Sequence, residues 1–129
     1  MAVIKNEGGV KKATKKILDK HKWFWWMPPA NGFGVSGISD FNAVKDGVFM
    51  AIETKFGPNK PTAMQGAFLR SINSEECFGF VVNEDTLEWL DVFLTEFERA
   101  KKDASEKRQM ANESGASMID AIRWLQMSI

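Results

Sequence analysis

Apolar side chains recur along this chain at two spacings, one typical of helices and the other of strands. In residues 6–22 the apolar or small positions come every three or four residues, and lysines fill the remaining arc. This pattern predicts an amphipathic helix that begins near Glu7. The same helical spacing recurs in three later segments, residues 62–75, 85–102 and 118–129.

Strand composition marks the segments between these helices. Residues 23–27, WFWWM, are aromatic and end at two prolines, and residues 78–83, FGFVVN, form a short apolar run. Both segments predict strands, because aromatic and β-branched side chains favour extended backbone. The connection over residues 28–37 is rich in Gly and Pro, so we expect it to be mobile or to bind something.

A β-hairpin is predicted around Asp46-Gly47. Apolar segments flank this dipeptide on both sides, and Asp-Gly supplies the positive φ angles that a two-residue type I′ turn needs. If Lys45 pairs with Val48 across the turn, the same register places Asp40 directly opposite Glu53. The sequence therefore predicts two carboxylates that face each other on neighbouring strands.

Together these elements predict an α/β fold, with a mixed central sheet of about four strands flanked by helices and with extra C-terminal helices. The length of 129 residues, of which 44% are hydrophobic and 26% charged, is typical of one compact domain. We place that domain over residues 1–102. Residues 103–129 are predicted to form a polar connection, up to residue 117, and the last helix, packed on the same domain or in a dimer interface.

The residue types limit the chemistry that is available. Cys77 is the only cysteine and His21 the only histidine. An intrachain disulfide and a cysteine-rich zinc site are therefore excluded, and oxygen atoms must supply most ligands of any metal.

Charge and hydropathy indicate the surroundings of the protein. Residues 1–22 carry a net charge of +5, although the whole chain is neutral. This basic end suits a polyanionic partner, or it is the solvated face of a helix. No apolar run approaches the roughly 20 residues that span a bilayer, and the N-terminus lacks the apolar stretch of a secretory signal. We therefore expect a cytoplasmic protein that does not associate with membranes.

The opposed carboxylates are the strongest chemical signal. Like charges directly opposite each other on adjacent strands are destabilising, and a divalent cation removes this conflict. Mg²⁺ commonly uses one or two carboxylates together with water and phosphate oxygens, which fits Asp40 and Glu53. Lys55 shares the strand face of Glu53 and could position a water that attacks a phosphate. The residues alone leave open a second interpretation, in which Glu53 and Lys55 form a surface salt bridge and Asp40 lies in a loop.

At this point the chain resembles a known nuclease family. The segment SGISDFNAVKDGVFMAIETKFGPNKPTAMQGAFLRSI is similar to VRR-NUC, the virus-type replication-repair nuclease domain of the PD-(D/E)xK, or restriction-endonuclease-like, superfamily. The resemblance runs from about Glu7 to Asn83 and is densest from Gly37 to Ile72. One departure is Ser39, where the family usually has the proline that shapes the turn before the aspartate.

The resemblance implies an active site and its metal. In the family, an acidic residue of the first helix, the Asp, the E-x-K pair and a Gln of the next helix form the site. The corresponding catalytic residues in this sequence are Glu7, Asp40, Glu53, Lys55 and Gln65. Mg²⁺ or Mn²⁺ would be held by Asp40, Glu53 and the backbone carbonyl of Thr54.

The resemblance also implies a function. It predicts a metal-dependent endonuclease that hydrolyses DNA phosphodiester bonds and prefers branched substrates, as Holliday-junction resolvases do. Such enzymes act as homodimers, and this branch of the family suggests a phage origin, so that the host cytoplasm would contain the protein. The alternative is a subunit with the nuclease fold that binds nucleic acid or assembles with partners but does not cleave.

Several side chains are consistent with more than one interpretation. Gln65 follows Thr62 at the spacing of a capping box, so it could cap the helix as well as serve the site. Trp23, Phe24, Trp25 and Trp26 could stack on unpaired bases, pack in the core or form a subunit interface. Four lysines are candidate DNA phosphate contacts, with a solvated face as the alternative: Lys11, Lys12, Lys15 and Lys60.

Overall fold

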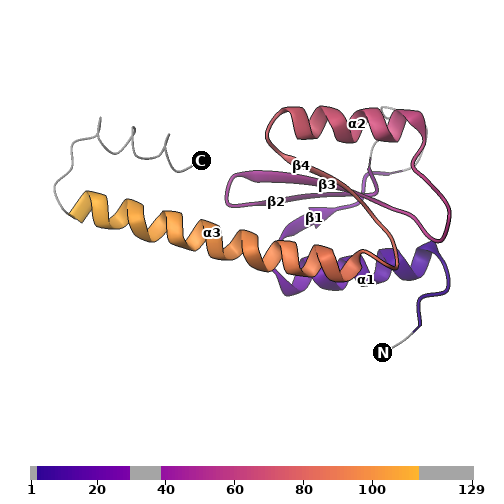
Figure 1. Cartoon of the computed structure of the whole chain (residues 1–129), viewed down its shortest axis with the longest axis horizontal. Coiled ribbons are helices and arrows are strands. Elements are labelled where there is room, and N and C mark those ends of the chain that lie inside the picture. Colours follow the sequence, from indigo (N-terminus) through magenta and orange to yellow (C-terminus); the bar gives the residue numbers. More distant parts are fainter. Residues whose placement is uncertain (1–2, 30–38, 114–129) are drawn as a thin grey trace. The chain divides into compact units, whose positions relative to one another are not determined.

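A computed structural model describes residues 3–29 and 39–113 of the chain. Over these ranges the fold is α/β, with a mixed four-stranded sheet and three helices (Figure 1). The predicted fold class is thereby confirmed. The elements in chain order are α1 (Glu7–Lys20), β1 (Phe24–Trp26), β2 (Phe41–Lys45), β3 (Val48–Thr54), α2 (Ala63–Ser74), β4 (Phe78–Val82) and α3 (Leu87–Glu113).

Contacts divide the chain into two compact units, Met1–Asp91 and Val92–Ile129. The first unit contains the sheet, α1, α2 and the first residues of α3, and the second contains the rest of α3. The sequence analysis places a domain boundary after residue 102 instead, and that boundary stays a prediction.

The helix α3 is longer than the sequence analysis predicts. Residues 103–113 were expected to begin a polar connection, and this expectation is wrong, because they continue α3 to Glu113. Most of these residues are Ala, Glu, Lys, Arg, Gln or Met, which favour helix even without an apolar stripe. The helix predicted over residues 118–129 lies outside the described residues, as does most of the connection over 28–37. None of the helices described is both long and apolar enough to cross a membrane.

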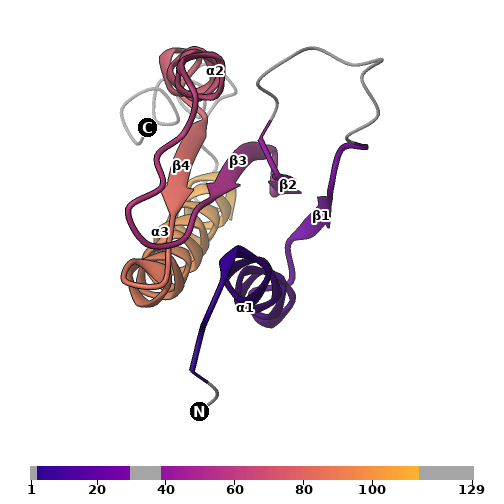
Figure 2. The same cartoon turned by 90° about the vertical axis from the view of Figure 1, so that its right-hand side faces the viewer.

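The sheet has the strand order β1-β2-β3-β4. Its first three strands pair antiparallel, and β3 and β4 pair parallel with α2 as their connection. A parallel pair needs such a crossover, because its second strand must start at the same end as the first. The two views show α2 and α1 on opposite sides of the sheet, with α2 next to β3 and β4 (Figures 1 and 2).

The predicted hairpin register is confirmed. Lys45 pairs with Val48, and Phe41 pairs with Ile52. Asp46 and Gly47 have φ angles of 51° and 80°, as a type I′ turn requires at both central positions. Because one turn fixes the whole ladder, the register extends to the last residue before β2 and sets Asp40 opposite Glu53.

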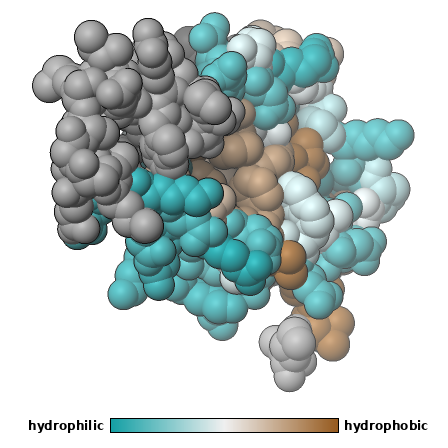
Figure 3. Space-filling model, turned by 60° about the vertical axis from the view of Figure 1, so that its left-hand side comes forward, coloured by the Kyte–Doolittle hydropathy of each residue, from teal (hydrophilic) through white to brown (hydrophobic). Residues whose placement is uncertain are grey.

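The core lies around β3, whose residues Met50 to Thr54 are all buried. Val10, Thr14 and Leu18 form the buried face of α1, as its periodicity predicts. Asn6 caps this helix by accepting a hydrogen bond from the backbone of Gly9, so α1 begins at Glu7 as expected. Hydrophobic surface also remains exposed on the described part of the chain, as the brown areas of Figure 3 show.

A close approach of α2 to β4 fixes the parallel half of the sheet. A Cβ atom on Gly79 would lie 2.8 Å from the carbonyl oxygen of Leu69 and 3.2 Å from its Cα. The Asn73 side chain also bonds to the backbone N–H and carbonyl of Gly79, at 2.8 and 3.1 Å. This amide occupies backbone groups on an edge strand that would otherwise be open to another chain.

The substitution Gly79→Ala should therefore destabilise the fold by about 1–3 kcal/mol, because backbone atoms must move to admit the new methyl group. Urea unfolding measures this loss. Gly66→Ala is the matched control within α2: its Cβ would meet only the flexible end of Arg70, at 3.3 Å. Alanine also favours a helix over glycine by roughly 1 kcal/mol. Equal stabilities of the two variants would contradict the close approach.

Candidate active site

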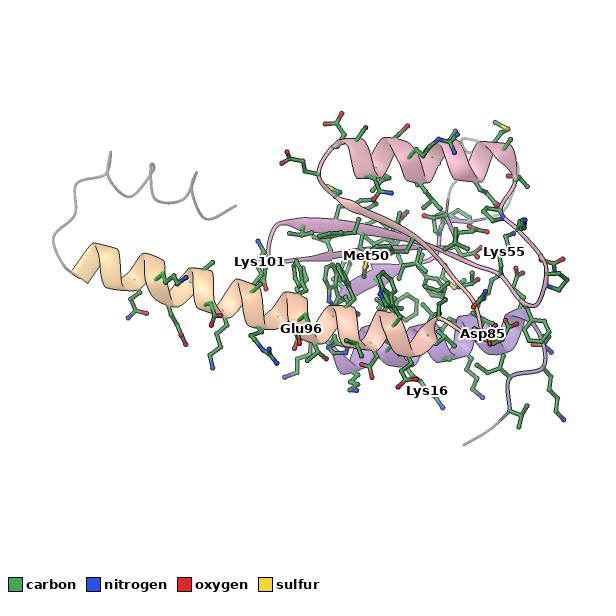
Figure 4. All side chains as sticks on the ribbon, viewed as in Figure 1. Lys16, Met50, Lys55, Asp85, Glu96 and Lys101 are labelled. Carbon is green, nitrogen blue, oxygen red and sulfur yellow. The ribbon has the colours of Figure 1, made fainter. Side chains whose placement is uncertain are left out.

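Four chain segments meet at one end of the sheet. They are the first turn of α1, the residue before β2, the end of β3 and the first turn of α2, and their polar side chains form one cluster. Figure 4 shows Lys55 at this end of the sheet, just after β3. The parallel crossover explains the place of α2, because its first turn follows the end of β3 after a short connection.

Asp40 is anchored through one of its two carboxylate oxygens. Oδ2 accepts hydrogen bonds from the backbone N–H of Thr54 at 2.9 Å and from its hydroxyl at 2.6 Å. The backbone N–H of Asp40 donates in turn to Oε2 of Glu53, at 3.2 Å. These bonds fix Asp40 across the ladder and leave Oδ1 as the oxygen that faces the rest of the cluster.

Glu53 is the most buried charged residue of the cluster, with 1% of its surface exposed. Its Oε1 accepts a hydrogen bond from Nε2 of Gln65 at 2.8 Å and lies 3.3 Å from the ammonium of Lys55. The opposite end of the Gln65 amide accepts a bond from the backbone N–H of Thr62, at 2.8 Å. Both interpretations of Gln65 are therefore correct: it completes a capping box and it binds the Glu53 carboxylate.

Glu7 and two lysines close the cluster into a ring. The Glu7 carboxylate lies 3.9 Å from the Lys55 ammonium and 3.8 Å from that of Lys11. Lys11 also lies 3.8 Å from Oδ1 of Asp40. Three carboxylates and two ammonium groups thus alternate around one small site.

The environment of the ring shifts the pKa of Glu53. Burial raises the pKa of its carboxyl from the usual 4.5 to about 7, and the nearby Asp40 adds to the rise. Lys55 opposes this increase in pKa but does not cancel it. The three carboxylates of the ring outnumber its two ammonium groups, so the site favours a further cation or a proton.

All five predicted catalytic residues come together in the structure. In the sequence, the main signal for Glu7 is its position at the start of a helix. In the structure, Glu7 joins the ring through contacts with Lys11 and Lys55. The sequence analysis treated Lys11 as a DNA phosphate contact and missed its place in the ring. The available signal was its spacing of four residues from Glu7, which puts both on one helix face.

The other three candidate phosphate contacts lie apart from the ring. Lys60 is exposed in the connection between β3 and α2, and the ammonium of Lys15 lies 6.0 Å from the ring centre of Trp25. Lys12 lines a groove of about 890 Å³ beside α1, whose charged lining residues also include Lys16, Glu84, Glu88 and Asp91. Mixed charges give this groove no clear preference for an anion, and the role of these lysines in DNA binding stays a prediction.

The aromatic segment divides between the two faces of the sheet. Trp23 is buried, and Trp25 packs edge to face on Phe41 with ring centres 5.6 Å apart. Phe24 and Trp26 point away from the core, with 72% and 40% of their surfaces exposed. A core role is therefore correct for Trp23 and wrong for Phe24 and Trp26, whose remaining alternatives are base stacking or a subunit interface.

The donor atoms of the site suit a hard divalent cation. Among residues 3–29 and 39–113, no group of three or more His, Cys, Asp or Glu side chains is arranged to hold a metal. A Mg²⁺ site does not need such a group, since one or two carboxylates and several waters are a common ligand set. Asp40, Glu53 and the backbone carbonyl of Thr54 offer oxygen alone. Burial and the nearby Asp40 raise the pKa of Glu53 to about 7, and a bound cation would favour its ionised form.

No family model and no curated protein sequence matches this chain. The resemblance to VRR-NUC nucleases therefore stays a prediction. Any argument about function must start from the geometry of the site.

The raised pKa of Glu53 predicts how stability depends on pH in EDTA. The folded carboxyl holds its proton more tightly than the unfolded one, so its contribution to folding is full below pH 4.5 and is lost as the pH rises to about 7. The loss should reach about 3 kcal/mol.

Urea unfolding of wild type and Glu53→Gln across pH 4–8 measures this contribution. The variant has no carboxyl at this position, so the difference between the two free energies of unfolding should change over the stated interval and stay constant above it. Parallel profiles for the two proteins would contradict the raised pKa.

Proposed function

We propose that the protein is a divalent-metal-dependent DNA endonuclease. The observation that supports this most directly is the arrangement of Asp40, Glu53 and Lys55 at one end of the sheet, with Glu53 buried and Lys55 3.3 Å from it. Burying Glu53 beside the partly exposed Asp40 is costly, and a surface salt bridge would not require it. Such a cost is usual at sites that bind a cation and perform chemistry.

Each residue of the ring has a distinct task in this proposal. A Mg²⁺ or Mn²⁺ ion held by Asp40, Glu53 and the Thr54 carbonyl would supply positive charge that polarises a phosphate and activates water. The Lys55 ammonium, whose side chain is 16% exposed, orients the attacking water and neutralises charge that develops on the phosphate.

Gln65 and Glu7 position these groups. Gln65 fixes the Glu53 carboxylate in one orientation, because its amide is itself held by the start of α2. Glu7 lies within 3.9 Å of the Lys55 ammonium and keeps it on the solvent side of Glu53. Preorganisation of this kind contributes to catalysis because the groups need not rearrange during the reaction.

The proposal also draws on the resemblance to VRR-NUC domains, whose residue pattern led to the same five side chains. A four-stranded mixed sheet with helices on both sides is consistent with the restriction-endonuclease-like fold. Phosphates and DNA shape would determine binding, since contacts to phosphates carry no base sequence. We therefore expect a preference for branched DNA in phage replication, recombination or repair, in the cytoplasm of the host cell.

The decisive test is cleavage of labelled DNA with Mg²⁺ or Mn²⁺, using a four-way junction, matched duplex and single strand. Asp40→Asn and Lys55→Met should each lower the rate by roughly 10²–10⁴-fold, because each removes a group that acts on the reacting phosphate. EDTA should abolish cleavage by the wild type.

Two matched controls exclude unspecific loss of activity. Asp46→Asn makes the same change at the turn of the same hairpin, where Asn tolerates the positive φ angle. Lys102→Met removes an exposed lysine of α3 to which no role in DNA binding is assigned. Both controls should cleave at nearly the wild-type rate. A folded wild type that binds the junction yet leaves every substrate intact would favour the alternative, a non-cleaving nucleic-acid-binding subunit.

Symmetric cleavage of a junction needs two sites, and one chain contains one such ring among its described residues. A homodimer is therefore part of the proposal. Sedimentation equilibrium should give a mass of about twice the 14.5 kDa of one chain, at the protein concentration at which both strands are cut. Paired cuts by a protein that sediments as a monomer would contradict it.

A further inference from the structure

A role in DNA binding does not explain why Lys11 lies in the ring. Its ammonium lies 3.8 Å from Oε2 of Glu7 and 3.8 Å from Oδ1 of Asp40. It comes from α1, whereas Asp40 precedes β2, so this contact joins two elements far apart in sequence. The Lys11 side chain is 32% exposed.

The contact of Lys11 with Asp40 involves a particular oxygen. Oδ2 of Asp40 already accepts two hydrogen bonds from Thr54, at 2.9 and 2.6 Å. Oδ1 is the oxygen that an incoming cation would use, and it is the one that Lys11 faces. A lysine ammonium and a divalent ion cannot both approach the same oxygen closely, because their positive charges repel.

The two lysines of the ring differ in how firmly they are held. Lys55 lies 3.3 Å from Glu53, and its side chain is 16% exposed. Among the described residues, Lys11 makes two longer contacts of 3.8 Å, and its side chain is twice as exposed, at 32%. Lys11 can therefore turn toward solvent at a smaller cost, while its spacing of one helical turn keeps it next to Glu7.

We propose that Lys11 is a displaceable counter-ion, which compensates Asp40 and Glu7 in the metal-free protein and gives up its place to a divalent cation, so that it sets the metal affinity of the site. This inference rests on the metal site of the proposed function. Lys11 is a positioning residue in this scheme, and it acts on the metal through Asp40.

Two consequences follow for a protein that lacks this charge. In Lys11→Met the metal no longer competes with an ammonium at Oδ1, so the variant should bind a divalent ion more tightly than the wild type. Without metal, the same variant leaves Oδ1 of Asp40 without its cation and Glu7 with Lys55 alone, and it should unfold at a lower temperature. A lysine that only bound DNA would produce neither change.

The experiment titrates the protein with Mn²⁺ in the absence of DNA and measures free Mn²⁺ by electron paramagnetic resonance. Lys11→Met should bind roughly five- to tenfold more tightly than the wild type, as expected from removing one nearby positive charge. Lys12→Met is the matched control, because it removes the same charge from the next residue of α1, which faces the groove instead of the ring. Asp40→Asn should lose the binding.

Thermal unfolding of the same proteins, in EDTA and in Mn²⁺, provides the second measurement. Lys11→Met should have the lower midpoint in EDTA and the larger gain on adding Mn²⁺, since stabilisation by a ligand increases with the logarithm of its affinity. This measurement also shows whether each variant is folded.

The outcomes separate this inference from the proposed function. If Asp40→Asn binds Mn²⁺ as the wild type does, or the wild type binds none, the metal site itself is wrong. If the wild type binds through Asp40 and Lys11→Met matches Lys12→Met, the site stands and the counter-ion role is overturned. Weaker binding by Lys11→Met would overturn it as well, because Lys11 would then support the metal ligands.

Discussion

The structure of this end of the molecule depends on one unfavourable interaction, the juxtaposition of Asp40 and Glu53 on neighbouring strands. The type I′ turn at Asp46-Gly47 fixes the hairpin register, and that register cannot slip by one residue without turning the buried face of β2, with Phe41 and Ala43, to solvent. The two carboxylates are thus held together by the packing of the whole hairpin. Neighbouring groups then have to compensate their charge.

The compensating groups come from all the elements that reach this end of the sheet. Thr54 satisfies one oxygen of Asp40 through its backbone and its hydroxyl. Gln65 and Lys55 bind one oxygen of Glu53, and the other accepts the backbone N–H of Asp40. Every oxygen of this pair has a described donor or cation, yet the pKa of Glu53 still rises to about 7. Hydrogen bonds alone therefore do not offset the burial of the charge.

Local signals made most of this arrangement predictable. The Asp-Gly turn gives the register, alternation along β3 puts Lys55 beside Glu53, and the spacing of Thr62 and Gln65 gives the capping box. Lys11 was misjudged because its contact with Asp40 depends on how α1 docks near β2, which no local pattern specifies. The length of α3 was underestimated for another reason: residues 103–113 favour helix by propensity, without the apolar stripe on which the prediction relied.

The same ring links the stability of the fold to its chemistry. The buried Glu53 carboxylate beside Asp40 lowers the free energy of unfolding, and replacing it with a neutral side chain would relieve that cost. A purely structural ion pair would gain nothing from this cost in stability. A cation that binds only the folded chain offsets the cost, because its binding free energy stabilises the folded state. The two lysines reduce this cost in the metal-free protein. Their ammonium groups lie 3.3 to 3.9 Å from the carboxylate oxygens, which is too long for tight hydrogen bonds. In the proposed scheme, a divalent cation would take over this compensation from the two ammonium groups.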